Sequence, residues 1–75
     1  MTNEAAANNA QAMIQIIRDS LTDGLAEYNT LQANAYIVSL LECRLIERAR
    51  FESLMVDKRA ARSAWTPKKG KRCHL

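Results

Sequence analysis

The sequence predicts an all-α fold, and three observations support this prediction. Residues 1–64 contain no proline, and the whole chain holds only two glycines. Alanine, leucine, glutamate, arginine, glutamine and methionine dominate, and these are strong helix formers. Apolar residues make up 48% of the chain and recur with helical spacing, which favours a packed core over disorder. We expect a helical hairpin in residues 1–64, with helices at about 4–28 and about 31–64, and a short basic tail at 65–75.

The first helix has one apolar stripe. At 100° per residue one side of it collects Ala6, Ala10, Met13, Ile14, Ile17, Leu21, Leu25 and Tyr28. Gly24 also lies on this side. Gly24 is either an interruption that lowers the stability of the helix by about 1 kcal/mol relative to alanine, or a position without a side chain where another helix crosses closely. The sequence leaves both interpretations open.

The second helix carries more apolar surface than one neighbouring helix can cover. Its start is placed after a break near Asn29 and Thr30, because asparagine tolerates the left-handed conformation and threonine caps helices. One stripe contains Leu31, Ala35, Val38, Leu45, Ala49 and Val56. A second stripe contains Ile37, Leu40, Leu41, Phe51 and Met55.

Two stripes on one helix require two neighbouring helices, and the expected hairpin supplies only one. We therefore expect the other neighbour to be a second copy of the chain, in a homodimer that completes a helical bundle, or a different protein; small domains often need a second copy for stability. The predicted protein interface consists of Tyr36, Ile37, Leu40, Leu41, Phe51 and Met55.

Charge divides the chain into an acidic body and a basic end. Residues 1–57 hold eight acids and four bases, whereas residues 58–75 hold seven bases and no acid. A basic segment attracts phosphates without reading a base sequence. The candidate nucleic-acid contacts are Arg59, Arg62, Lys68, Lys69, Lys71 and Arg72. The competing interpretation is a solubilising end that complements the dipole of the preceding helix, with Trp65 folded back onto the helical body.

Residues suited to catalysis or metal binding are few. His74 is the only histidine, and its neighbour Cys73 is poorly spaced for a second ligand on the same metal. The chain has no glycine-rich phosphate loop and no Ser-His-Asp set. We expect neither enzymatic activity nor a cofactor or metal. Cys43 is interpreted as a small core residue.

The same features suggest a location and a function. Two cysteines do not make a disulfide framework, no apolar run reaches the roughly 18 residues of a membrane span, and residues 1–12 lack the basic start of a secretory signal. We expect a cytoplasmic protein with no membrane partner, in a host cell if a phage or plasmid encodes it. The favoured function is a non-catalytic interaction module, an adaptor or inhibitor that docks on a larger protein. The alternative is a regulatory protein that binds nucleic acid through the basic end of the second helix and the tail.

Overall fold

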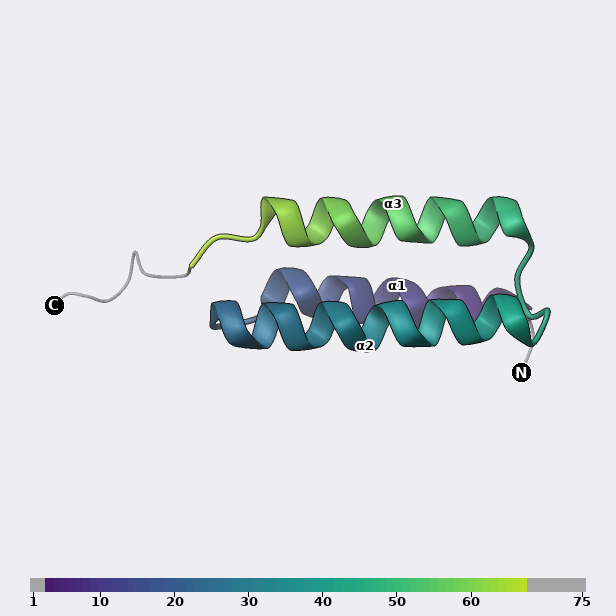
Figure 1. The fold of residues 1–75 in the computed structure, drawn as a ribbon, viewed down its shortest axis with the longest axis horizontal. Coiled ribbons are helices and arrows are strands. Elements are labelled where there is room, and N and C mark those ends of the chain that lie inside the picture. The colour runs from purple at the N-terminus through teal and green to yellow at the C-terminus, as the bar shows by residue number, and fades with distance from the viewer. Residues whose placement is uncertain (1–2, 68–75) are drawn as a thin grey trace, which may run out of the picture.

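Three helices, rather than the two predicted, form the protein. The computed structural model describes residues 3–67, in which α1 spans Asn3–Asp19, α2 spans Asp23–Glu42 and α3 spans Arg48–Ala64. The helices run up, down and up, so that α1 and α3 begin at the same end of the bundle (Figure 1). Each helix contacts the other two, and the described part of the chain contains no strand. The all-helical prediction is confirmed, and the division into two helices is wrong.

The first break falls at residues 20–22, inside the expected first helix. Thr22 is the N-cap of α2, and its side-chain oxygen accepts a hydrogen bond from the Leu25 N–H at 3.1 Å. Such a cap satisfies one of the four amide groups that a helix start leaves without an intrahelical partner. Asp23 follows in the first turn, where a negative charge complements the helix dipole. Together these residues begin a new helix without any proline.

Asn29 and Thr30, the predicted break, lie in the middle of α2. The Thr30 hydroxyl donates to the Ala26 carbonyl at 2.7 Å, one turn back along the same helix. The Asn29 amide donates to the Ser20 hydroxyl at 2.9 Å, which ties α2 to the turn that precedes it. Both side chains therefore find partners while the backbone stays helical, which is why the prediction of a break here is wrong.

The second break, between α2 and α3, is a Schellman turn without glycine. The Leu45 N–H donates to the Leu40 carbonyl at 2.8 Å, and the Arg44 N–H donates to the Leu41 carbonyl at 3.0 Å. Arg44 takes the left-handed position with φ of 60°, which glycine or asparagine usually occupies. Ile46, buried just beyond the turn, anchors the chain as it reverses into α3.

The core is a narrow seam of aliphatic side chains along the whole bundle. Its larger members are isoleucines and leucines, and its alanines let the helices approach closely. Its buried members are Ala6, Ala10, Ile14, Ile17, Ala33, Ile37, Leu40, Ile46, Leu54 and Ala61. Within residues 3–67, no helix has both the length and the apolarity needed to cross a membrane.

One charged side chain lies inside the bundle. Lys58 of α3 is buried, and its ammonium group donates to the Asn34 side-chain oxygen of α2 at 2.9 Å. Burial lowers the pKa of Lys58 below its usual value of 10.5, and the adjacent charge of Arg59 acts in the same direction. The unfolded chain therefore holds this proton more tightly than the folded chain does. The charged lysine lowers the stability at neutral pH, and this cost disappears as the pH rises through the folded-state pKa towards 10.5.

A Lys58→Met variant is expected to remove this pH-dependent cost. The free energy of unfolding of the variant, minus that of the wild type, should fall as the pH rises from about 7 to about 10. Urea unfolding followed by circular dichroism measures this difference, and other titrating groups cancel because both proteins share them. A difference that stays constant over this range would show that the lysine ammonium is hydrated in the folded protein.

Candidate protein-interaction surface

The predicted interface residues line the inside of the single chain. Ile37 and Leu40 are buried core residues. The other four are half-buried side chains that pack against this core: Tyr36, Leu41, Phe51 and Met55. The third helix is the reason, because α3, which carries Phe51 and Met55, folds back over the part of the stripe that lies on α2. The side chains of Ile37 and Leu40 are thus not available to a second protein.

Most of the large apolar side chains that remain exposed lie in the half of the bundle around the α1–α2 turn. Among residues 3–67 there are six of them, and five lie between positions 16 and 31: Ile16, Leu21, Leu25, Tyr28 and Leu31. The sequence placed Leu21, Leu25 and Tyr28 on the core stripe of the first helix and Leu31 on a stripe of the second, whereas Ile16 falls off the stripe of the first helix. Because the helix breaks at residues 20–22, α2 turns this end of the stripe outward.

The exposed side of α2 has the spacing of a coiled-coil seam. Its residues follow one another at alternating intervals of four and three: Gly24, Tyr28, Leu31, Ala35, Val38 and Glu42. Val38 is half-buried and the other five are exposed. Such a 4-3 spacing keeps one face of a helix towards a partner helix over its whole length. These six residues are called the α2 outer face from here on.

This face is nearly free of charge. No acidic or basic residue occurs from position 28 to position 41, so α2 carries only Asp23, Glu27 and Glu42. Glu27 and Asp23 point towards α3, where Arg62 binds both of them. A helix with one side in the core and an uncharged, partly apolar other side is typical of a helix with protein on both sides.

The apolar surface continues onto the edge of α1. The Asn9 amide of α1 donates to the Tyr36 hydroxyl of α2 at 3.4 Å, so this side of α1 borders α2. Ile16 lies two turns further along the same side of α1, and it is half exposed. Ile16 therefore extends the apolar surface sideways from α2.

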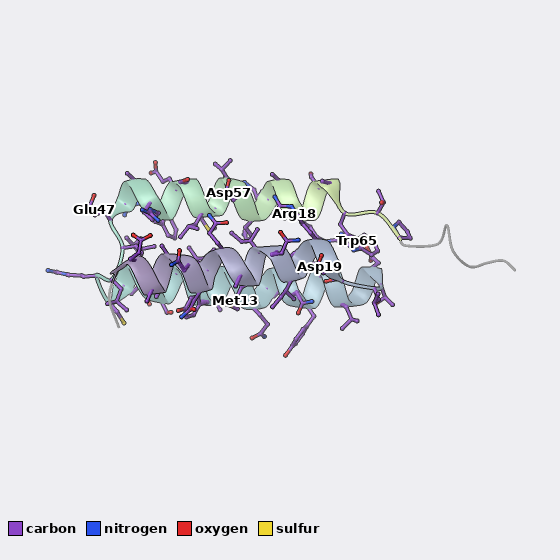
Figure 2. The ribbon with its side chains drawn as sticks, turned by 180° about the vertical axis from the view of Figure 1, so that it is seen from behind. Met13, Arg18, Asp19, Glu47, Asp57 and Trp65 are labelled. Atoms are coloured by element: carbon purple, nitrogen blue, oxygen red, sulfur yellow. The ribbon has the colours of Figure 1, made fainter. Side chains whose placement is uncertain are left out.

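Polar contacts hold the far end of α3 against the turn between α1 and α2. Arg62 donates to Asp23 at 2.8 Å and to Glu27 at 3.2 Å, and these hydrogen bonds raise the pKa of Arg62 above its ordinary value. The Trp65 ring N–H donates to the Ser20 carbonyl at 2.8 Å, and the Arg62 guanidinium carbon lies 5.6 Å from the centre of the ring. Trp65 sits beside the end of α1 that carries Asp19 (Figure 2). The expectation that Trp65 folds back onto the body is confirmed.

The candidate nucleic-acid contacts are only partly within the described chain. Arg59 is exposed on α3, whereas Arg62 is already bound to two carboxylates. Lys68, Lys69, Lys71 and Arg72 lie outside the described residues. The described part of the protein thus leaves one of the predicted basic side chains, Arg59, unpaired with an acid and facing solvent.

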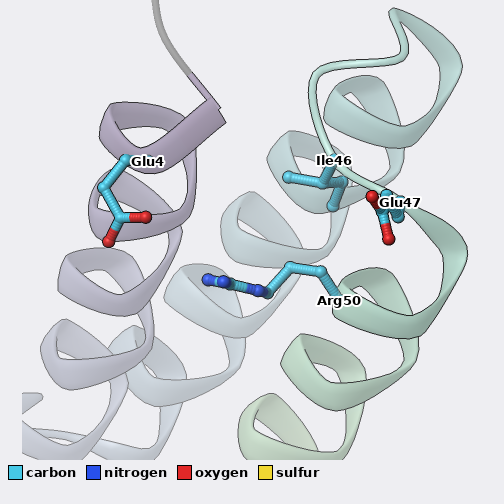
Figure 3. Close-up of a pocket in the computed structure, with 4 residues that line it drawn as sticks. All are labelled: Glu4, Ile46, Glu47 and Arg50. Atoms are coloured by element: carbon cyan, nitrogen blue, oxygen red, sulfur yellow. The ribbon is translucent and has the colours of Figure 1, made fainter.

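A small open pocket and an exposed thiol lie at the opposite end of the bundle. The pocket has a volume of about 180 Å³ and is lined by Glu4, Ile46, Glu47 and Arg50, with Arg50 extending from α3 towards α1 (Figure 3). Cys43 is exposed at the end of α2, so its interpretation as a core residue is wrong. Among residues 3–67, no three His, Cys, Asp or Glu side chains come together as a metal site.

Comparison with known proteins identifies no relative. No family model matches the chain, and neither a curated protein nor a solved structure is significantly similar to it. Interpretation of the surface therefore rests on its own residues.

Proposed function

We propose that this protein is a non-catalytic interaction module, an adaptor or inhibitor, that binds a helix of its partner on the α2 outer face. The single observation that carries this proposal is the exposed apolar seam of Tyr28, Leu31 and Ala35, in a segment without charges. An amphipathic helix bound in this way offers apolar anchors at intervals of three and four residues, which is the spacing found on α2. The homodimer expected from the sequence is one way to cover the same face.

The nucleic-acid alternative has less support. Arg62 already donates hydrogen bonds to Asp23 and Glu27. Asp19 adds a further negative charge at the same end of the bundle. A phosphate backbone approaching this end meets those carboxylates as well as the bases of the chain.

Leu31→Glu is expected to weaken partner binding strongly. A carboxylate at the centre of an apolar helix interface loses its hydration without a cationic partner. At a central contact we expect roughly 30-fold weaker binding or more, the ratio that corresponds to about 2 kcal/mol. The measurement is capture of the partner on tagged protein from a nuclease-treated lysate of the source organism, followed by titration with the captured protein.

Val56→Glu is the matched control for this experiment. Val56 of α3 is 57% exposed and Leu31 is 59% exposed, so both substitutions place a charge on a similarly exposed apolar position. Val56 lies away from the α2 outer face, and its variant should bind like the wild type. Equal binding by both variants would contradict the proposal. Loss of the partner on nuclease treatment alone would favour the nucleic-acid alternative.

A further inference from the structure

We infer that the α2 outer face is covered by α2 of a second copy of this chain, paired in antiparallel order about a two-fold axis between Leu31 and Ala35. This inference rests on the proposed function, because it takes a second copy of this chain, rather than a different protein, as the partner that binds the α2 outer face. Two features of α2 favour this order over the parallel one, and a third favours this register.

The first feature is the size of the side chains along the seam. In antiparallel order with this axis, Leu31 of one copy packs beside Ala35 of the other, and Tyr28 packs beside Val38. Each layer then joins a larger side chain with a smaller one, so that the two helices interdigitate. Parallel order places Tyr28 against Tyr28 and Leu31 against Leu31, which forces equal large side chains into the same layers.

The second feature is the charge at the two ends of the seam. Parallel order places Glu42 of one copy against Glu42 of the other, and like charges in one layer repel. Antiparallel order instead places Glu42 at the first turn of the other copy, opposite Gly24. There the free amide groups of the helix start offset the charge of Asp23, which Arg62 already binds, so Glu42 meets less repulsion than it would from a second Glu42. A Cβ added at Gly24 would have only the Thr22 side chain near it, at 4.0 Å, so there is open space above this glycine.

The third feature is the overlap of the helices. With the axis between Leu31 and Ala35, α2 lies over the full length of its copy, since this axis is close to the middle of Asp23–Glu42. The residues that flank the seam there are mostly uncharged, with Leu25, Gln32 and Ser39 on one side and Asn34 and Leu41 on the other. α2 contains no lysine or arginine, and the flanking Glu27 is already bound by Arg62.

The arrangement predicts a specific cross-link. In a Cys43→Ser, Cys73→Ser background, the double variant Gly24→Cys, Glu42→Cys should oxidise to a covalent dimer, because each new cysteine faces its counterpart on the other copy. The two positions are 18 residues apart on one helix, about 27 Å, so they cannot join within a chain. Both positions are exposed, and circular dichroism should show that the helical fold is kept.

Single variants and a shifted pair serve as controls. Gly24→Cys alone and Glu42→Cys alone should stay uncross-linked, because copies of one position lie at opposite ends of an antiparallel pair. The pair Gly24→Cys, Ala35→Cys tests the register one heptad away and should also stay uncross-linked. Sedimentation equilibrium of the wild type should give twice the chain mass of 8.5 kDa, and Leu31→Glu should give the monomer.

Each outcome decides between defined possibilities. A dimer that cross-links only through the double variant at positions 24 and 42 supports the inference. Cross-linking by Glu42→Cys alone would establish parallel order and overturn it, and cross-linking by the shifted pair would overturn the register. A monomeric wild type whose capture of another protein is abolished by Leu31→Glu would overturn the second copy and leave the proposed function standing. A monomeric wild type whose capture of another protein is unaffected by Leu31→Glu would overturn both the second copy and the proposed function.

Discussion

Leu54→Ala is expected to lower the free energy of unfolding by about 2–5 kcal/mol, the usual cost of removing a buried leucine side chain. Leu54 is completely buried on α3, within the same core as Ile14, Ile17 and Ile37. The substitution leaves a cavity between three helices and removes the main aliphatic contact of α3. Small domains are stable by only about 5 kcal/mol or somewhat more, so the variant should be close to unfolded. Urea unfolding followed by circular dichroism at 222 nm, the helical band, gives the difference.

Val56→Ala is the control for Leu54→Ala. Val56 lies two residues away on the same helix and is mostly exposed. Its substitution should therefore change the free energy of unfolding by no more than about 0.5 kcal/mol. Similar losses in both variants would mean that α3 does not dock on α1 and α2 through Leu54, and the three-helix arrangement would then be wrong.

Trp65→Ala is expected to lower the free energy of unfolding by roughly 2–3 kcal/mol. The Ser20 carbonyl loses the ring N–H that donates to it, and a partly buried acceptor without a donor costs about 1–3 kcal/mol. The ring also supports Arg62, which joins α3 to the first turn of α2. Loss of the ring should therefore release the end of α3 as well as lower the global stability.

Trp65→Phe separates the two contributions, since phenylalanine keeps a ring and lacks the N–H donor. The free energy of unfolding of Trp65→Phe should fall only by the contribution of the lost hydrogen bond, about 1 kcal/mol. Amide hydrogen exchange in the last turn of α3 should speed up in Trp65→Ala much more than in Trp65→Phe. Unchanged stability and exchange in Trp65→Ala would contradict the anchoring role of this residue.

The helical class of the protein and the position of Trp65 follow from the sequence alone. Strong helix formers, the lack of proline through residue 64 and the helical spacing of apolar residues are local properties, so the sequence is sufficient to predict helices. Trp65 has a large apolar ring and a single donor, and folding back onto the body satisfies both.

The number of helices depends on contacts that cannot be recognised in the sequence. Glycine and proline are the strongest signals for a chain reversal, and neither of the two turns is built on one. The Thr22 cap and the left-handed Arg44 make these turns, and they persist because Ser20 and Ile46 are buried beside them. Asn29 and Thr30 look like a break but bond to Ser20 and Ala26 in the folded protein. Burial beside the two turns and side-chain hydrogen bonds of Asn29 and Thr30 thus override the local preference at three places.

The location of the exposed apolar surface was likewise decided by the tertiary structure. The sequence determined that the chain has more apolar helix surface than a hairpin can bury, which is a matter of composition and spacing. It did not determine which stripe stays outside, because an apolar stripe is equally suited to the same chain or to another one. The turn at residues 43–47 brings α3 over Ile37 and Leu40 and leaves Tyr28 and Leu31 in solvent. Burial depends on which segments the turns bring together, and only the folded chain contains that information.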